Sequence, residues 1–539
     1  MAGLAASFGS GASTNPIGDI ENSDVILITG SNTTENHPVL SSYVKRAVKF
    51  KGTKLIVIDP RKIKISEFAD KWLRPNPGTD VAWINGLIHV ILKEGLQNQS
   101  FIDERCEDFE ELGPSVEMFT PEYVEKITGI AAEDIIETAR LYAKAGKASI
   151  LYCMGITQHS HGTDNVKGLA NLAMTCGNLG IEGAGVNPLR GQNNVQGACD
   201  MGGLPSVFTA YQPVTDSAIV KKMETAWNVT GISNKVGLTV TEMVPKAHEG
   251  EIKSLYVVGE NPLVSDPDLN HAEESFKNLE FLVVQDLFMT ETAQMADVVF
   301  PSLAFAEKDG TFSNMERKVQ RIRRAITGPG EAKTDWEIIS GVARAMGYPM
   351  NYRDVEEIFA ELASVTPSYA GISYERIEEE GLQWPCPTSD HPGTPILHVD
   401  GFTRGKGKFF PLEFIPPAEG TDHTYPLVLT TGRVLYHYHT GTMTRKTEGL
   451  NERVPECFVE ISKEDAAKFQ LKDESMAEIF SRRGKIKAKV KISPKAAEGT
   501  IFIPFHFAEA AANRLTNKAL DPIAKIPEFK VCAVAINAC

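Results

Sequence analysis

The chain lacks a hydrophobic run long enough to cross a membrane. A span needs about 20 consecutive apolar residues, and the best candidate, VAWINGLIHVILKEG from Val81, is interrupted by Asn85, His89 and Lys93. This run predicts an amphipathic helix, so we expect no direct insertion into a membrane. The first residues, MAGLAASFGSGASTNP, hold neither a basic segment nor an apolar core, and they do not form a signal peptide.

Paired cysteines and a dinucleotide fingerprint are also missing. None of the eight cysteines forms a C-x-x-C pair, so no iron–sulfur or structural zinc motif is visible. Scattered single thiols favour a reducing compartment, and we expect a cytoplasmic protein. No G-x-G-x-x-G opens a helix after the first predicted strand, which disfavours an NAD-dependent dehydrogenase.

Basic residues are fewer than acidic ones, with 55 lysines and arginines against 70 aspartates and glutamates. The net charge of −15 argues against nucleic acid as the main partner. Apolar residues make up 42% and charged residues 23% of the chain, the proportions of an ordinary globular protein. A length of 539 residues is too great for a single core and suggests roughly three or four domains.

What the sequence does contain is an α/β pattern in which two regions share one arrangement. In the first region, DVILITGSN ends a predicted strand with Gly30 and Asn32. KLIVIDPR then ends in Asp59, and ADKWLRPNPGTD carries Asp70. Short apolar runs that end in polar turns and alternate with helical segments are typical of parallel sheets.

The second region repeats this order with Gly259, Asp286 and Asp297, in SLYVVGEN, FLVVQDLFMT and ADVVFPS. The glycine and first aspartate are 29 residues apart in the first region and 27 in the second, and the two aspartates are 11 apart in both. Two Rossmann-like domains are therefore predicted, each with a nucleotide-like ligand at its strand ends. A glycine there lets the backbone approach a phosphate, and an aspartate accepts hydrogen bonds from ribose or guanine. For either region alone, ordinary strand-end turns remain an alternative.

The C-terminal part of the chain changes pattern. A Gly-, Pro- and Phe-rich linker at 401–424 precedes six short strands: PLVLTTG, CFVEIS, MAEIFS, KIKAKVKI, TIFIPFHF and KVCAVAI. Their alternation and β-branched residues predict a small β-barrel. We therefore predict an α/β fold with Rossmann-like domains at 1–192 and 193–400, the linker at 401–424 and the barrel at 425–539.

The stretch NPLRGQNNVQGACDMGGLP, from Asn187 to Pro205, concentrates neutral hydrogen-bonding groups around one guanidinium. It holds three asparagines, two glutamines and four glycines, with Arg190 as its only cation and Asp200 as its only anion. Such a stretch suits a large polar cofactor with a small anionic substrate beside it. An arginine binds both oxygens of a carboxylate in a fixed orientation. A structural ion pair is the alternative role for Arg190.

Together these features resemble the molybdopterin oxidoreductases, and most closely the catalytic subunit of formate dehydrogenase. The similarity is carried by the stretch from Met154 to Pro205 and by VVQDLFMTETAQMADVVFPS, KTDWEIIS, ARAMGYPMNY and KVCAV. It implies oxidation of formate to CO2 at molybdenum or tungsten held by two molybdopterin guanine dinucleotides. It also implies a [4Fe-4S] cluster that passes electrons to iron–sulfur, flavin or hydrogenase subunits, as in anaerobic metabolism.

The resemblance also implies the residues of the site. Formate would be oriented by Arg190 and Gln192. One guanine nucleotide would be lined by Gly30, Asn32, Asp59, Arg61, Gly78 and Asp80, and the other by Gly259, Asp286 and Thr290. Pterin, phosphate or dithiolene would contact Met154, Gly155, Gln158, Gln192, Arg433, His437, Asn513 and Lys530. Cys199 is interpreted as structural, and His159 and His161 as supporting residues at most.

The family's cluster ligands, and the cysteine or selenocysteine that binds its metal, have no counterpart in this chain. The family carries VAGLAASFGSGA a few residues after that metal ligand, and the chain begins MAGLAASFGSGA. The metal's protein ligand is therefore expected upstream of Met1, where an export signal could also lie. A selenocysteine UGA codon read as a stop, with a restart at a GUG valine codon, would explain this position. Upstream DNA without an in-frame UGA would exclude that hypothesis.

A shortened second Rossmann-like domain would lack strands that cover its sheet. We expect exposed apolar surface, an open strand edge and poor folding or aggregation of the isolated chain. Two functional alternatives stay open: another molybdopterin oxidoreductase of the nitrate or formylmethanofuran type, or an inert cofactor-binding fragment. The stretch from Arg190 to Asp200 disfavours the former.

Overall fold

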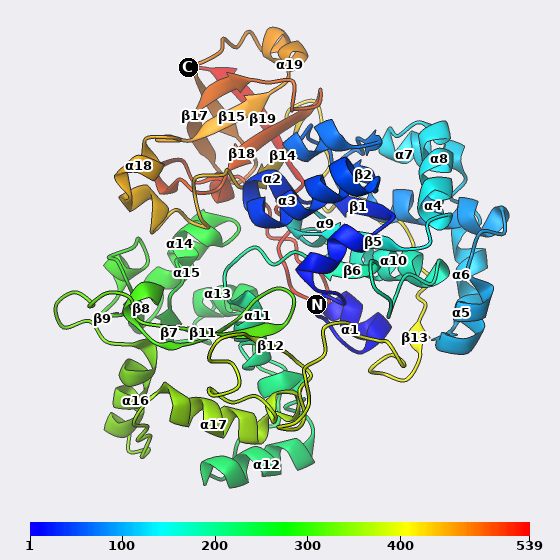
Figure 1. Ribbon diagram of the computed structural model, residues 1–539. Helices are drawn as coiled ribbons and strands as arrows, with labels where there is room; N and C mark the ends of the chain where they lie inside the picture. The colour runs from blue at the N-terminus through cyan, green and yellow to red at the C-terminus, as the bar shows by residue number, and fades with distance from the viewer. The chain divides into compact units, whose positions relative to one another are not determined.

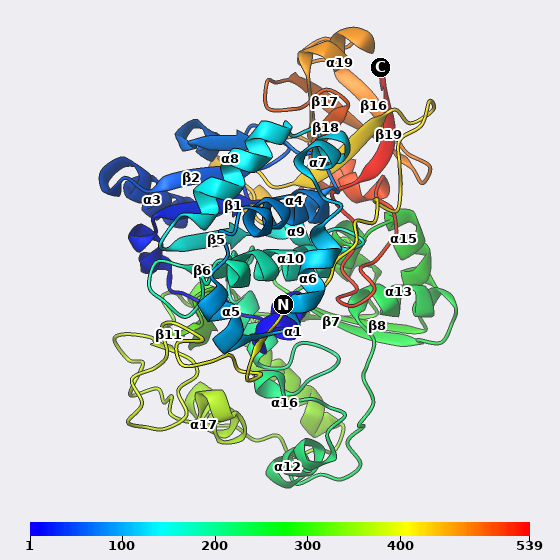
Figure 2. The same cartoon turned by 90° about the vertical axis from the view of Figure 1, so that its right-hand side faces the viewer.

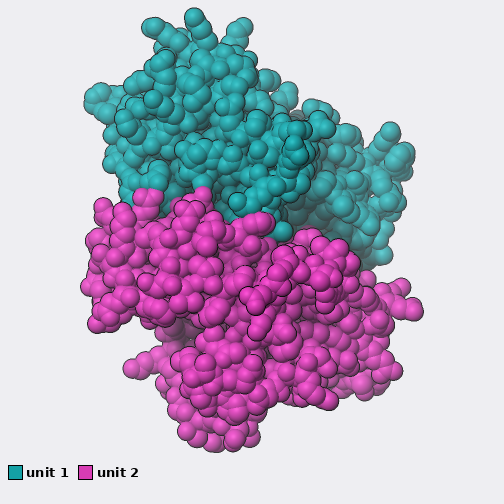
Figure 3. Space-filling view, turned by 90° about the vertical axis from the view of Figure 1, so that its left-hand side faces the viewer, with its two compact units in different colours: residues 1–191, 264–270, 396–539 teal, residues 192–263, 271–395 magenta.

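The computed structural model describes all residues from Met1 to Cys539 and divides them into two compact units (Figure 3). Unit 1 comprises 1–191, 264–270 and 396–539, and unit 2 comprises 192–263 and 271–395. The chain passes from unit 1 to unit 2 between Gly191 and Gln192, and the domain boundaries given above stay a prediction. The C-terminal barrel belongs to the same unit as the first Rossmann-like domain.

Unit 1 is built on a five-stranded parallel sheet with the order β3-β2-β1-β5-β6. Its strands are β1 (Val25–Thr29), β2 (Lys54–Ile58), β3 (Lys71–Leu73), β5 (Ala148–Tyr152) and β6 (Gly185–Pro188). Every residue of β1 and β5 is buried, as expected for central strands of a parallel sheet that is covered on both faces.

Helices cover this sheet (Figure 2). Helix α8 contacts β1 and β3, and α10 contacts β5 and β6. The helices of this part are α1 (Ala2–Phe8), α2 (Thr33–Asn36), α3 (Pro38–Arg46), α4 (Asp80–Lys93), α5 (Gln99–Arg105), α6 (Phe109–Val116), α7 (Pro121–Thr128), α8 (Ala132–Ala143), α9 (Met154–Thr157) and α10 (Gly162–Thr175). A short parallel pair joins β4 (Cys106–Glu107) to β13 (Gly407–Lys408) of the predicted linker.

The amphipathic character expected for α4 was wrong, although the helix itself was predicted correctly. It is buried at every position from Asp80 to Ile91, because it packs against α7, α8 and α10. One nitrogen of each of two polar side chains lies at a backbone carbonyl group, while Asn85 Oδ1 and His89 Nε2 have no partner in the protein. Asn85 Nδ2 donates to Leu412 O at 2.9 Å, and His89 Nδ1 lies 3.0 Å from Val116 O.

The barrel of unit 1 contains all six predicted strands. They are β14 (Leu427–Gly432), β15 (Phe458–Ile461), β16 (Met476–Phe480), β17 (Lys485–Ile492), β18 (Thr500–Pro504) and β19 (Cys532–Ala538). They close in the order β14-β18-β15-β17-β16-β19, in orange to red in Figure 1. Short helices α18 (Glu448–Asn451) and α19 (Lys463–Lys468) connect them. The lysines of KIKAKVKI face outward while its isoleucine, alanine and valine are more buried. This alternation is typical of a strand that has one face toward solvent and the other toward the barrel interior.

Unit 2 contains a three-stranded parallel sheet, β7 (Ser254–Val258), β8 (Phe281–Asp286) and β9 (Val298–Pro301). A second, antiparallel sheet joins β10 (Gly310–Ser313), β11 (Lys318–Ile322) and β12 (Leu382–Gln383). The helices are α11 (Val195–Asp200), α12 (Ser217–Trp227), α13 (Val240–His248), α16 (Asp335–Ala345) and α17 (Val355–Val365). The remaining two, α14 (Pro262–Ser265) and α15 (Leu269–Lys277), lie where the chain passes between the units.

The two parallel sheets confirm the predicted repeat through equivalent hydrogen bonds. Gly30 N donates to Ile58 O at 3.3 Å, and Gly259 N donates to Gln285 O at 2.8 Å. Both acceptors directly precede the strand-end aspartate.

The third predicted aspartate also has one role in both sheets. Asp70 Oδ2 accepts the backbone N–H of Leu55 at 2.9 Å, and Asp297 Oδ2 accepts that of Leu282 at 2.7 Å. In each repeat the acceptor lies just before the third strand, β3 or β9, and the donor is the second residue of the second strand, β2 or β8. The spacing of 11 residues thus reflects a shared strand-edge contact.

The sheet of unit 2 lacks a counterpart of β5, which pairs with the first strand in unit 1. In unit 1, β1 pairs with both β2 and β5, whereas β7 of unit 2 pairs with β8 alone. Apolar side chains on this sheet are exposed, with exposed fractions of 40% for Tyr256, 44% for Val258 and 46% for Phe281. The expected open edge and exposed apolar surface are therefore present.

No helix of the structure has both the length and the apolar character needed to cross a lipid bilayer.

Candidate functional site

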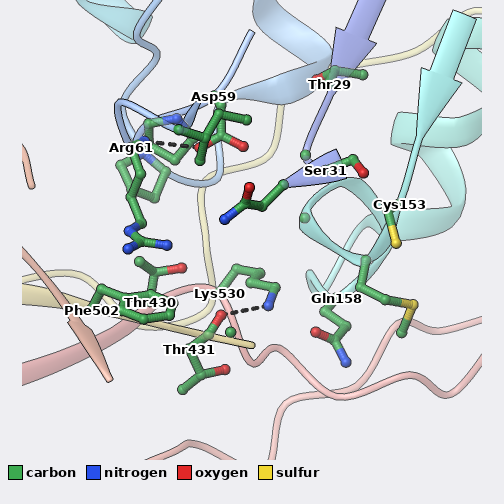
Figure 4. Close-up of a pocket in the computed structure, with 18 of the residues that line it drawn as sticks. Thr29, Ser31, Asp59, Arg61, Cys153, Gln158, Thr430, Thr431, Phe502 and Lys530 are labelled. Carbon is green, nitrogen blue, oxygen red and sulfur yellow. Dashed lines mark hydrogen bonds between the residues drawn. The ribbon is translucent and has the colours of Figure 1, made fainter. Parts of the chain in front are cut away.

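A cavity of about 1020 Å³ lies at the carboxyl ends of β1, β2 and β5 in unit 1 (Figure 4). This volume includes space open to solvent, and the 28 residues that line it offer contacts for a large ligand. The turns after the three strands form one side, and residues of the barrel, including Thr430, Thr431 and Phe502, form the other. Concave sites at the strand ends of parallel sheets are where such folds commonly bind cofactors.

Eleven of the residues expected in the cofactor site line this cavity together. They are Gly30, Asn32, Asp59, Arg61, Gly78, Asp80, Met154, Gly155, Gln158, Arg433 and Lys530. They come from positions up to 500 residues apart in the sequence. The topology of the sheet brings the first nine to one edge, and the packing of the barrel adds the last two.

The turn after β1 is built around a close backbone approach. Gly30 has φ +56°, and a Cβ atom there would lie 2.6 Å from Ile156 N. Gly155 N donates to Gly30 O at 3.0 Å, so the turn after β1 packs directly on the start of α9. Only glycine adopts this φ without strain and leaves this space. The exposed backbone of the turn is therefore available to a ligand.

Four buried polar atoms on residues that line the cavity have no hydrogen-bond partner in the protein. They are Ser31 Oγ, Asn32 Oδ1, His37 Nδ1 and His159 Nδ1. Buried polar groups are normally satisfied. These atoms therefore indicate a ligand with several hydrogen-bonding groups.

The cavity carries both signs of charge, and burial changes the pKa of each group. Burial raises the pKa of Asp59 to about 6, although Asp59 Oδ1 accepts the Arg61 N–H at 2.9 Å. Burial likewise raises the pKa of Asp80 to about 7, and it lowers the pKa of Lys530 to about 8. Lys530 Nζ donates to Thr431 O at 2.6 Å (Figure 4). The charged forms of these groups lack the water that would stabilise them, and a polar ligand supplies a replacement.

Arg61 is held between the first domain and the barrel. Its Nε and one terminal nitrogen donate to Glu460 Oε1 at 3.1 and 2.8 Å, and its guanidinium carbon lies 3.6 Å from the centroid of the Phe502 ring. The side chain is thus already paired and stacked. It therefore forms a rigid part of the cavity wall.

Arg190 follows β6 and belongs to unit 1, but it is not among the residues that line the cavity. One terminal nitrogen donates to Gly11 O at 3.2 Å. Burial raises the pKa of the cavity-lining thiol Cys153, and the charges of Arg433, Lys530 and Arg190 oppose that rise. Arg190 is therefore within electrostatic reach of the cavity.

Two predicted residues of the barrel region lie away from this cavity. His437 is buried, with Nε2 at 2.7 Å from Val454 O. Asn513 Nδ2 donates to Val264 O at 3.1 Å and to Ser265 O at 2.8 Å. Both side chains make structural contacts to backbone carbonyls.

The other predicted positions, Gln192, Gly259, Asp286 and Thr290, belong to unit 2. Asp286 Oδ1 accepts the N–H of Phe288 at 3.2 Å, just as Asp59 accepts that of Arg61. Burial raises the pKa of Asp286. Gly259 has φ +63°, and a Cβ atom there would meet no other atom within 4 Å. The second turn repeats the geometry of the first with more space around it.

In the QHSHGTDN loop, one ring nitrogen of His159 is held by a backbone carbonyl and the other has no partner in the protein. His159 is buried and lines the cavity, with Nε2 at 2.8 Å from Gly155 O and 3.6 Å from Asp80 Oδ2. Burial lowers its pKa to about 4, so it is neutral near pH 7. No group of three or more His, Cys, Asp and Glu side chains has an arrangement that could hold a metal ion.

Sequence reasoning missed His37, Cys153 and the barrel residues Thr430, Thr431 and Phe502, which all line the cavity. His37 carried a usable signal, since it lies seven residues after Gly30 in the same turn region and directly before Pro38. The barrel residues carried none, because nothing in PLVLTTG or TIFIPFHF identifies which strand end faces another domain.

The fold and this cavity define a protein that binds a large polar cofactor at the strand ends of a Rossmann-like domain. A model of the molybdopterin oxidoreductases matches residues 4–345, and a model of the molydopterin dinucleotide binding domain matches residues 427–533. The chain therefore belongs to the molybdopterin oxidoreductase family.

Several named proteins are similar over the whole chain. It is 51% identical to the F420-dependent formate dehydrogenase 1 subunit alpha of Methanococcus maripaludis, across 100% of this chain and 80% of that protein. It is 52% identical to the F420-dependent formate dehydrogenase subunit alpha of Methanocaldococcus jannaschii, with the same coverage. It is 41% identical to formate dehydrogenase H of Escherichia coli, across 100% of this chain and 76% of that protein.

Among solved structures, the acetylene hydratase of Pelobacter acetylenicus shares the fold. The TM-score is 0.80 at 21% sequence identity, and the match covers 100% of this chain and 80% of that chain. This likeness supports the α/β architecture with its C-terminal barrel.

Proposed function

We propose that this chain is the catalytic subunit of a formate dehydrogenase, which oxidises formate to CO2. The observation that carries the proposal is the similarity of 41–52% identity over the full chain to three proteins named as formate dehydrogenases. The family also implies further subunits, which we propose to be electron-transfer proteins of the iron–sulfur, flavin or hydrogenase type.

The cavity fits one molybdopterin guanine dinucleotide. Its unpartnered atoms on Ser31, Asn32 and His37 provide hydrogen-bonding sites, and the backbone at Gly30 permits close approach by a phosphate. Lys530 and Arg433 provide positive charge for the diphosphate. Asp59 accepts hydrogen bonds from guanine or ribose donors. When bound, the two dinucleotides hold a molybdenum or tungsten ion that accepts electrons from the substrate.

Arg190 is proposed to hold formate. A guanidinium binds both carboxylate oxygens through parallel N–H groups and thereby fixes the direction of the formate C–H bond. Gln192, two residues along, is proposed to donate an amide hydrogen bond to the substrate or the cofactor without adding charge. The rest of the amide-rich stretch keeps the site neutral, so the substrate's negative charge meets one strong cation.

The substitution Arg190→Lys tests this function. Lysine keeps the charge but loses the paired N–H groups, and loss of one charge-assisted hydrogen bond of about 1.5–3 kcal/mol corresponds to a fall in kcat/KM for formate of about 10–150-fold. Steady-state kinetics of the cofactor-loaded protein provide the measurement. The control is Arg140→Lys, at an exposed arginine paired with Glu94, which should leave kcat/KM unchanged. An unchanged kcat/KM in Arg190→Lys would contradict the role of Arg190.

A further inference from the structure

The backbone at Arg190 is held by three side chains that line the cavity. Cys153 Sγ donates to Leu189 O at 3.0 Å, and Arg433 donates to Gly191 O at 2.7 Å. Between them, His37 Nε2 lies 2.8 Å from Arg190 O. Three successive carbonyl groups are thus bound by side chains from the turn after β1, the turn after β5 and the barrel.

The hydrogen bond of His37 fixes its tautomer. A carbonyl oxygen can only accept, so Nε2 must carry the proton. Burial lowers the pKa of His37, and although the Arg190 carbonyl opposes this, the charge of Arg433 adds to it, so the ring is neutral near pH 7. A neutral imidazole has a single N–H. Its Nδ1 is therefore an acceptor, and this atom is buried without a partner in the protein.

We propose that His37 is a positioning residue that connects the cofactor cavity to the substrate arginine. Its Nδ1 accepts a hydrogen bond from an N–H or O–H of the pterin dinucleotide, and its Nε2–H holds the carbonyl of Arg190. Binding of the cofactor then orders the imidazole, and the ordered imidazole fixes the backbone from which Arg190 reaches the substrate. The substrate part of this inference rests on the proposed function, whereas the cofactor part does not.

The two halves of the proposal can be separated by two isosteric substitutions. In His37→Gln, the amide nitrogen takes the place of Nε2 and keeps the donor to Arg190 O, but no acceptor replaces Nδ1. In His37→Asn, the amide oxygen takes the place of Nδ1 and keeps the acceptor, but the donor to Arg190 O is lost. Each protein is produced together with the upstream segment in which the metal's protein ligand is expected, in a host that makes the pterin dinucleotide. Thermal unfolding confirms that it is folded.

Two quantities are measured: the pterin retained per protein after exhaustive dialysis, and the KM for formate of the loaded fraction. One lost hydrogen bond corresponds to a change of about fivefold to tenfold. His37→Gln should lose pterin by about this factor with KM within about twofold of the wild type. His37→Asn should retain pterin and show a KM raised by about the same factor.

The proposal is overturned if both variants change the same quantity to the same extent, or if neither changes either quantity. If the loaded wild type does not oxidise formate, the proposed function fails. The pterin measurement still decides whether Nδ1 binds the cofactor. His37→Ala removes both groups and should combine the two defects.

Discussion

At the scale of single residues, the cavity is dominated by titratable groups that are poorly stabilised by the protein itself. Asp59, Asp80 and Lys530 all have pKa values moved by burial toward their neutral forms. Such shifts are typical of sites that bind a charged or strongly polar ligand. The free protein is therefore less stable at neutral pH than its fold alone would allow.

This destabilisation makes a prediction about pH. The pKa of Asp59 is raised from 3.8 to about 6, so between these values the folded cofactor-free protein binds more protons than the unfolded chain, and its stability falls as the pH rises. Asp59→Asn removes the charge and keeps the acceptor for Arg61 N–H. It should stabilise the cofactor-free protein by up to about 3 kcal/mol at pH 7 and have little effect near pH 4. Urea unfolding at several pH values measures this.

The control for this prediction is Asp70→Asn. Burial acts to raise the pKa of Asp70, but Lys54 and the Leu55 N–H outweigh it and the net pKa is lowered. Its ionised form therefore stabilises the fold above its unfolded pKa, and this stabilisation is lost as the pH falls. Asp70→Asn should destabilise the protein at pH 7 and converge with the wild type in acid. Identical pH profiles for the two variants would contradict the assignment.

At the scale of elements, the two strand–turn units have the same backbone conformation at the glycine but differ in the packing around it. Gly30 and Gly259 both adopt positive φ and both donate to the strand-end carbonyl of the neighbouring strand. Around Gly30 the chain is tightly packed by α9, whereas the space around Gly259 is open. Both positions therefore require a positive φ, but only Gly30 is also closely packed by a neighbouring helix.

Alanine substitutions separate these two effects. Gly259→Ala should cost about 1–2 kcal/mol, which is the penalty for an L-residue at positive φ. Gly30→Ala adds a contact of 2.6 Å with Ile156 N, and it should cost more than about 3 kcal/mol and abolish pterin binding. Hydrogen exchange of peptides from β1 and β2, compared with β7 and β8, reports each sheet separately. Equal losses would show that packing against α9 contributes nothing.

At the scale of the whole molecule, the beginning and end of the chain form one unit around the cavity. The barrel is attached to the first domain by buried carboxylates. Glu528 accepts the N–H and O–H of Ser160 at 3.1 and 2.8 Å, and Asp521 accepts those of Thr163 at 2.8 and 2.7 Å. Thr163 is the second residue of α10, so Asp521 also satisfies an N–H group that has no partner within the helix.

Glu528→Ala should uncouple the barrel from the first domain. The substitution removes a fully buried acceptor and leaves buried donors on Ser160 without a partner, at a cost of about 3–5 kcal/mol. Calorimetry should then show a separate, earlier transition, with faster hydrogen exchange in α10 and in the peptide that contains Lys530. The exposed Glu413→Ala serves as the control and should leave the unfolding transition unchanged. A single, unshifted transition in Glu528→Ala would contradict this coupling.

Much of the fold could be predicted because its signals are local. Strand-forming runs, the Gly and Asp at their ends, and the repeated spacing all lie within short segments, and parallel topology brings such strand ends to one edge. On this basis the sequence singled out Gly30, Asn32 and Asp59, which line one cavity. The other eight expected cofactor residues that line it were implied by the family resemblance. The positions of His437 and Asn513 were not predictable in this way. Their contacts depend on how the barrel packs.

By itself, the sequence determined the strand-forming runs of the two Rossmann-like regions, their glycine–aspartate turns, the six strands of the barrel and the single guanidinium in the amide-rich stretch. Only the tertiary structure decided that α4 is buried on all sides, that barrel residues complete the cavity, and that His37 holds the carbonyl of Arg190. The physical reason is the separation in sequence over which each kind of interaction acts. Periodicity and turn chemistry act between neighbours in the chain. A hydrogen bond across 153 residues exists only after the sheet and its surrounding elements have packed.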